Sequence, residues 1–91
     1  MKRKEFLAKL GSDKGKNLVI EIEGEIIQKV TIEKMGLEIE EDRIYIQDSI
    51  NLDFVVIYLN TIRDIIENPD NITLFIEDSK ETKIKISVKS L

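Results

Sequence analysis

Apolar residues recur at every second position through much of this chain, and this spacing constrains the fold more than any other feature. Leu18, Ile20 and Ile22 follow it early in the sequence, and Ile84 and Ile86 follow it near the end. Successive side chains of a β-strand point to opposite faces of a sheet, so a period of two predicts strands with one buried and one solvated face. We therefore expect a mainly β fold.

The strand signal recurs in separate segments that polar turns divide. These segments are 18–23, 26–35, 37–39, 44–46, 54–59, 72–76 and 83–88. They predict a small, strongly bent antiparallel sheet or a barrel of five to six strands within residues 18–88. Residues 60–67 fit two interpretations, either a helix capped by Asn60 or a strand that bends around a corner. A turn is expected at 68–71, where Pro69 presets the backbone dihedral.

A short helix is expected before the strands. Phe6 and Leu10 lie at helical spacing within residues 1–11, and Gly11 stands where a left-handed C-cap would end the helix. A helix this short is not stable alone in water, so its apolar side should pack on the sheet. A length of 91 residues suits one small domain that occupies the whole of 1–91.

The inward-facing positions of these segments make up the expected core. It comprises Phe6, Leu10, Leu18, Ile20, Ile22, Val30, Ile32, Ile44, Ile46, Phe54, Val56, Tyr58, Ile62, Ile72, Leu74, Ile76, Ile84 and Ile86. On the outer side of the last segment, Lys83, Lys85 and Lys89 are typical of an edge strand that discourages pairing with other chains.

The segment 54–59 differs from its neighbours because it is apolar on both faces. Such a strand is covered on both sides, by the core on one and by a helix or a partner chain on the other. Val55, Ile57 and Leu59 lie opposite the predicted core positions and are the candidate interface residues. They predict a homo-oligomer or a complex with another protein.

Charge is divided unevenly along the chain. Residues 1–17 carry a net charge of +4 and residues 18–91 a net charge of −8. The candidate nucleic-acid contacts are the clustered bases Lys2, Arg3, Lys4 and Lys9. Basic side chains bind nucleic acid by displacing the counterions of its phosphates. The acidic remainder of the chain should repel those phosphates, which disfavours a nucleic-acid partner.

Most of the residues that carry chemistry are missing, because the chain has no histidine, cysteine or tryptophan. Nucleophilic triads therefore lack an imidazole or a thiol, and exposed carboxylates are poor catalysts at neutral pH. We expect no enzyme and no catalytic, cofactor-binding or metal-binding residues. The sequence shows neither a secretory apolar stretch nor a membrane span, so we expect a cytoplasmic protein without membrane contact.

Two motifs and the order of the segments resemble a known architecture. Leu18-x-Ile20-x-Ile22-x-Gly24 is similar to the opening of the first motif of Sm-like proteins, and the run 59–65 looks like the strand that closes their barrel. The chain thus resembles the small Sm-like and SH3-like barrels, in particular short bacterial Sm-like proteins. That resemblance implies a ring or a dimer and often RNA binding at Asp, Asn and Arg-Gly positions. Here residues 35–38 contain no asparagine, and the hairpin 72–88 is additional.

Two functions follow as expectations. The first is a non-enzymatic module for protein interaction or assembly, which binds through apolar strand faces while an acidic rim selects basic partners. The second is an Sm-like RNA-binding protein that uses the basic segment before Leu18. Salt separates the two, because phosphate-driven binding weakens steeply with ionic strength and apolar protein binding does not.

Overall fold

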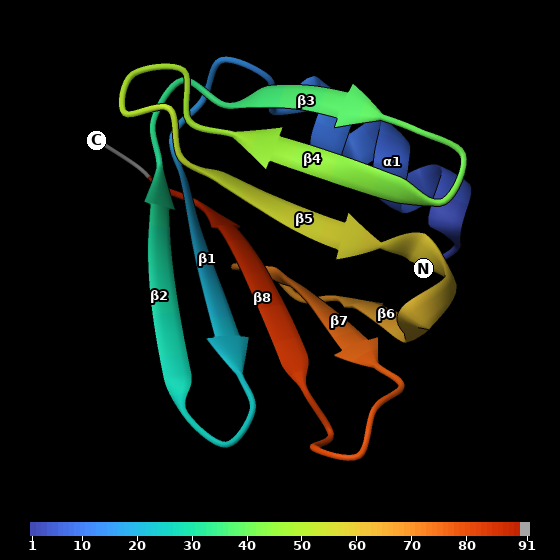
Figure 1. Ribbon diagram of the computed structural model, residues 1–91. Helices are drawn as coiled ribbons and strands as arrows, with labels where there is room; N and C mark the ends of the chain where they lie inside the picture. The colour runs from blue at the N-terminus through green and yellow to red at the C-terminus, as the bar shows by residue number, and fades with distance from the viewer. Residues whose placement is uncertain (90–91) are drawn as a thin grey trace.

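Two antiparallel sheets and one α-helix make up residues 1–89, the part of the chain that the computed structural model describes (Figure 1). The larger sheet has the order β2 (Ile27–Ile32), β1 (Leu18–Glu23), β8 (Lys83–Val88), β7 (Ile72–Ile76) and β6 (Ile62–Glu67). The smaller sheet has the order β3 (Gly36–Ile39), β4 (Arg43–Gln47) and β5 (Phe54–Tyr58). The prediction of a mainly β fold with a short N-terminal helix is confirmed. Five to six strands was too low a number, because these residues form eight, and the sheets do not close into a barrel.

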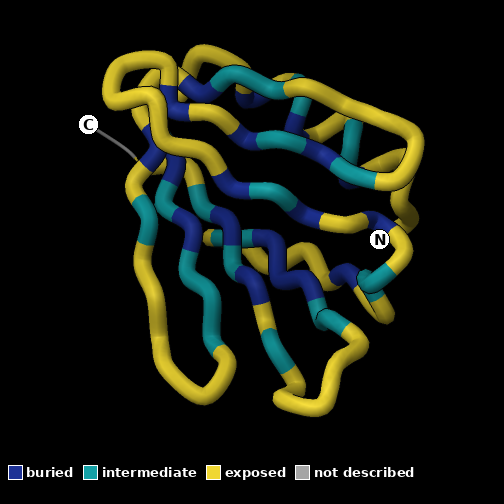
Figure 2. The backbone as a smooth tube through the Cα atoms, in the orientation of Figure 1, coloured by how far each residue is buried: buried dark blue, intermediate teal, exposed yellow. Residues whose placement is uncertain are grey.

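An apolar core joins both sheets and the helix α1 (Arg3–Ser12). Phe6 and Leu10 of the helix are almost fully buried, as are Ile20 of β1 and Leu74 of β7. Buried segments run along the middle of the molecule, whereas the hairpin loops at the ends of the large sheet are exposed (Figure 2). Figure 1 shows α1 behind β3 and β4, so the helix covers the inner side of the small sheet. Burial of its apolar side stabilises this short helix.

The end of α1 differs from the expectation. Gly11 lies inside the helix, which continues to Ser12, and the left-handed residue is Gly15 with φ +83°. The Gly15 N–H donates to the carbonyl of Met35 at 2.8 Å, and the Met35 N–H donates to the carbonyl of Lys16 at 2.8 Å. The chain after α1 is therefore held by hydrogen bonds to a distant segment around Met35. The local sequence could not predict this pairing.

The strand β8 is an interior strand of the large sheet, because it pairs with both β1 and β7. The expectation of a lysine-lined edge strand is therefore wrong. Lys83 lies opposite Glu23 and Lys85 opposite Glu21, and the Lys85 ammonium donates to the Glu23 carboxylate at 3.3 Å. The lysines balance carboxylates across the strands, and the edges of this sheet are β2 and β6.

The two interpretations of residues 60–67 are decided in favour of the strand. A single 3-10 turn, η1 (Leu59–Thr61), leads into β6, whose pairing with β7 shifts between Ile62 and Asp64. The following turn forms as expected, with the Asn68 N–H donating to the carbonyl of Asn71 at 2.8 Å.

The faces of β5 are the reverse of those predicted. Val55, Ile57 and Leu59, predicted to form an interface, are core residues with exposures of 9%, 2% and 2%. Phe54 and Tyr58, predicted for the core, are exposed. Every residue from 54 to 59 is apolar or aromatic, so the period of two gave no basis for choosing a face. The register decides it, because Ile57 and Val55 lie opposite the buried isoleucines of β4.

None of the helices within residues 1–89 is long and apolar enough to cross a membrane.

Candidate functional site

The outer side of the three-stranded sheet carries an exposed group of aromatic and apolar side chains. Tyr45, Phe54, Val56 and Tyr58 form this group, which we call the aromatic face; Phe54 and Tyr58 are exposed, and Tyr45 and Val56 are half-buried. It holds three of the five aromatic residues of the chain. Phe54 and Tyr58 are 61% and 47% exposed. Large apolar side chains that lie exposed next to one another are typical of a binding surface.

The pairing of β4 with β5 assembles the aromatic face. Tyr45 lies opposite Val56, and Arg43 lies opposite Tyr58. The ring centroids of Tyr45 and Phe54 are 6.5 Å apart, a separation at which aromatic pairs attract. The guanidinium carbon of Arg43 lies 5.1 Å from the centroid of the Tyr58 ring, within range of a cation–π interaction. These contacts fix the positions of the rings relative to one another.

Arg43 contributes little free positive charge to the aromatic face. Its Nε and Nη2 donate to the carboxylate of Asp42 at 2.9 and 2.8 Å, and its Nε lies 3.6 Å from a carboxylate oxygen of Glu40. The hydrogen bond from Arg43 lowers the pKa of Asp42 below its ordinary value. The two carboxylates therefore neutralise the guanidinium where it covers the Tyr58 ring.

Acidic residues are concentrated in the small sheet and its loops. Residues 36–58 contain six acidic residues and one basic residue, which gives a net charge of −5. The rest of the 91-residue chain sums to +1. An apolar surface with negative charge around it attracts basic groups and repels phosphates.

A buried aspartate organises the loop between β4 and β5, residues 48–53. Asp48 is 1% exposed. Its Oδ1 accepts hydrogen bonds from the main-chain N–H groups of Ile50 and Asn51 at 2.9 and 2.8 Å, and its Oδ2 accepts one from the Asn51 amide at 3.0 Å. The bond from the Asn51 N–H leads these bonds in lowering the pKa of Asp48 to about 2, against the opposing effect of burial. Hydrogen bonds to the charged Asp48 carboxylate therefore hold the loop in its conformation.

The same loop presents apolar side chains to solvent. Leu52 has φ +62° and is 82% exposed, and Ile50 is 52% exposed. The Leu52 N–H donates to the carbonyl of Asp48 at 3.0 Å. A cavity of about 370 Å³ beside the loop is lined by Leu52 and by Phe54 of the aromatic face. The loop tip is therefore continuous with that face.

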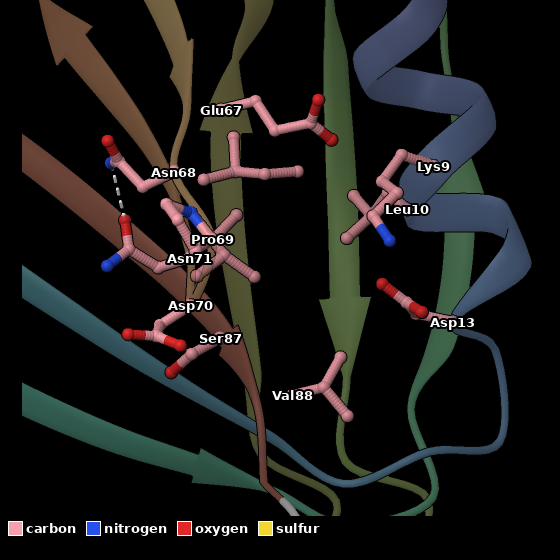
Figure 3. A pocket seen from close by; sticks show the side chains of 12 residues that line it. Lys9, Leu10, Asp13, Glu67, Asn68, Pro69, Asp70, Asn71, Ser87 and Val88 are labelled. Atoms are coloured by element: carbon pink, nitrogen blue, oxygen red, sulfur yellow. Dashed lines mark hydrogen bonds between the residues drawn. The ribbon is translucent and has the colours of Figure 1, made fainter.

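A second cavity, of about 330 Å³, lies between the C-terminal end of α1 and the β6–β7 turn (Figure 3). Its lining comprises Lys9, Leu10, Asp13, Glu67, Asn68, Pro69, Asp70, Asn71, Ile72, Ile86, Ser87 and Val88. Asn68 donates its side-chain N–H to the Asn71 amide oxygen at 3.0 Å, and the Thr73 hydroxyl donates to that oxygen at 2.9 Å. Asp13 accepts a hydrogen bond from Lys16 at 3.2 Å. These bonds hold the turn and the helix end in place.

The basic residues of the N-terminal segment do not meet the aromatic face. Lys2, Lys4 and Lys9 are exposed on or beside α1, whereas the aromatic face belongs to β4 and β5. Arg3 donates its Nη2 to the carbonyl of Leu59 at 2.9 Å, which holds this side chain against the chain itself. Phe6 is fully buried and offers no ring to a base.

Residues 1–89 contain no group of three or more acidic side chains placed to hold a metal ion. The carboxylates of β1 lie in the charge pairs of the large sheet, as shown by the ion pair of Glu23 with Lys85.

The sequence prediction missed the aromatic face and the role of Leu52. One signal for the face was present, since the Tyr58 hydroxyl is the only side-chain polar atom in segment 54–59 and requires a route to water. A second was the polar set Arg43 and Gln47 in β4, which lies opposite Tyr58 and Phe54 in the hairpin. The positive φ of Leu52 carries no signal in the sequence, because leucine rarely adopts it.

The chain matches no protein-family model, no curated protein and no solved structure at a significant level.

Proposed function

We infer that this protein is a non-enzymatic interaction module that binds a basic protein partner on the aromatic face. The observation that carries the proposal is the aromatic face, in which Phe54 and Tyr58 are exposed beside the half-buried Tyr45 and Val56. It lies on the sheet formed by residues 36–58, whose net charge of −5 exceeds the net charge of −4 of the whole chain. Tyrosine and phenylalanine are enriched at the centres of protein interfaces, where their rings exclude water.

Charge selects the kind of partner. The net charge of −5 over residues 36–58 favours approach by lysine- and arginine-rich surfaces and speeds their association. The same charge disfavours pairing of two copies through this face, since each would bring equal negative charge. A partner with alternating basic and apolar residues matches both features, because its apolar groups contact the rings while its bases reach the acidic rim.

Self-association remains a second proposal, on a different surface. The residues that first suggested it, Val55, Ile57 and Leu59, are buried in the core. The observation that supports it now is the edge strand β2, beside which Ile26 and Ile27 are 68% and 72% exposed. An unprotected strand edge with apolar residues is a template for pairing with another chain.

RNA binding of the Sm-like kind rests on one supporting observation, the exposure of Lys2, Lys4 and Lys9. The exposed aromatic residues within residues 1–89 are Phe54 and Tyr58 of β5, whereas these bases lie on or beside α1. A nucleotide base needs an aromatic ring on which to stack. We therefore place this function second to protein binding.

Titration with a defined peptide tests the proposal. A short peptide that alternates lysine with leucine should shift the amide NMR signals of β4 and β5, and its counterpart with glutamate in place of lysine should not. Shifts confined to α1, or equal shifts with both peptides, would overturn the proposal.

Two single variants make the titration specific. Phe54→Ser removes an exposed ring of the aromatic face and should weaken binding of the lysine peptide about tenfold. Ile66→Ser is the matched control, because Ile66 is an exposed apolar residue, at 43%, on the large sheet. Equal losses in the two variants would show that binding is unspecific.

A further inference from the structure

We propose that the β4–β5 loop, residues 48–53, is the anchor of this interface and that Leu52 enters a concave apolar pocket with a basic rim on the partner protein. This inference rests on the proposed function and names the partner's complementary feature. It starts from Leu52, which combines a left-handed backbone conformation with an exposed apolar side chain.

Leu52 combines two unfavourable properties. Its φ of +62° lies in the left-handed region, which is costly for a side chain with a Cβ and favours glycine or asparagine. Its side chain is 82% exposed, so burial in the core does not offset that cost. Strained residues of this kind persist where the surroundings hold them, often at ligand-binding sites.

The other left-handed residues make the contrast clear. Lys34 and Glu81, with φ of +50° and +52°, are the remaining non-glycine residues of this kind within residues 1–89. Both carry long charged side chains in solvent, which is the ordinary place for such groups. Leu52 alone among the three presents a large apolar side chain.

The loop holds Leu52 in place before any partner arrives. The Asp48 carboxylate accepts three hydrogen bonds from the loop, two from main-chain N–H groups and one from the Asn51 amide, and its own main-chain N–H donates to the carbonyl of Asp53 at 2.7 Å. The Ser49 N–H donates to the carbonyl of Glu33 at 3.0 Å, which ties the loop to the end of β2. A loop backbone that is already ordered loses little entropy on binding, so an anchor carried by such a loop gains affinity.

Charge and continuity identify the occupant as a protein pocket with basic groups. The loop joins the aromatic face through Phe54, so a partner on that face also reaches Leu52. The tip lies within the segment of net charge −5, which an anionic membrane would repel. A cavity lined by apolar atoms and edged with ammonium or guanidinium groups satisfies both the leucine and the surrounding carboxylates.

A chemical host with those properties tests the inference without knowledge of the natural partner. The probe is an amino-substituted cyclodextrin, a ring that encloses an apolar cavity under a rim of ammonium groups. The matched probe is a carboxylate-substituted cyclodextrin. We expect the amino host to shift the Leu52 methyl NMR signals and to bind more tightly than the carboxylate host. Equal binding of the two hosts would overturn the assignment of a basic rim.

Substitution of Leu52 separates an anchor from a structural role. Leu52→Gly and Leu52→Asn both accept the positive φ, and each should weaken binding of the amino host roughly tenfold by removing the buried leucine. The urea midpoint of each variant should stay equal to that of the parent protein or rise, because strain is relieved. Lys34→Gly is the control, since it relieves the same strain at φ +50° and should leave host binding unchanged.

Three outcomes would overturn the anchor. Undiminished host binding by Leu52→Gly would show that the leucine does not enter the cavity. A lower urea midpoint with undiminished binding would assign Leu52 a structural role. Leucine-dependent binding to vesicles of anionic lipid would replace the protein pocket with a membrane. If the lysine–leucine peptide still shifts the NMR signals of β4 and β5 in any of these cases, only the anchor proposal is wrong. If the peptide causes no such shifts in the parent protein, the proposed function is wrong as well.

Discussion

The outer faces of the two sheets present different kinds of side chain to solvent. On the large sheet, Glu21 lies between Lys29 and Lys85, and Glu23 lies opposite Lys83. On the small sheet, the corresponding positions of β4 and β5 hold Tyr45, Phe54, Val56 and Tyr58. The first face mixes ions of alternating sign with the apolar residues Ile27, Phe75 and Ile66, and the Lys83 ammonium lies over the Phe75 ring at 5.7 Å. The second face brings three aromatic rings together and leaves those of Phe54 and Tyr58 in contact with water.

This difference localises the function. A ladder of paired charges is complete by itself, because each carboxylate has an ammonium neighbour across the strand. Exposed rings are incomplete by themselves, because water contact with apolar surface is unfavourable and a partner would remove it. The binding surface therefore belongs to the small sheet.

Aspartate substitutions at neighbouring positions of β5 should give the largest difference between its two faces. Ile57→Asp places an unpaired charge among buried residues and should lower the free energy of unfolding by about 4 kcal/mol or more. Tyr58→Asp replaces an exposed side chain and should change it by about 1 kcal/mol or less. Urea unfolding followed by circular dichroism measures both, and a folded Ile57→Asp protein would reverse our assignment of the faces.

An acid titration should give a smaller effect, confined to the small sheet. The pKa of Asp48 is about 2 in the folded protein against an ordinary value of 3.8. A depressed pKa contributes stability above the ordinary value, and this contribution is lost as the pH falls from about 4 to about 2. Asp48→Asn should therefore be less stable than the parent protein at neutral pH, and the gap should narrow over that range. A gap that stays constant from neutral pH to about pH 2 would contradict the role given to this carboxylate.

The smallest effect is expected on the outer face of the large sheet. Glu23→Gln removes the ion pair with Lys85, whose two side chains are partly exposed at 29% and 38%. Such pairs contribute about 0.5 kcal/mol or less to the free energy of unfolding, and salt weakens them further. Thermal unfolding at low and high salt measures this contribution. A loss of more than about 1 kcal/mol in the free energy of unfolding would contradict a weak, solvent-screened ion pair.

Strands with clear alternation were predictable from the sequence. The segments 18–23, 72–76 and 83–88 form β1, β7 and β8 with the expected bounds, and in β1 and β8 charged residues at every second position mark one face. The segment 26–35 was too long a prediction, since Lys34 takes a positive φ and ends the strand's extended path. Local periodicity reports which residues are extended and says nothing of where a strand lies within its sheet.

The candidate site was not predictable in the same way. Segment 54–59 lacks charged and amide side chains, so its face depends on the register with β4, and that register depends on the geometry of the 48–53 loop. The loop in turn depends on the burial of Asp48, which requires the complete fold. The acidity around the site was visible in the sequence, but its concentration on one sheet required knowledge of which strands pair.

The position of β8 between β1 and β7 also affects how the protein is made. Leu18 pairs with Val88, so strands from opposite ends of the chain must meet before the large sheet is complete. A ribosome delivers β8 after every other strand, and until then β1 and β7 each keep an unpaired edge. The large sheet can therefore be completed only once β8 has been synthesised, and a nascent chain that stalls before residue 83 exposes two strand edges to its neighbours.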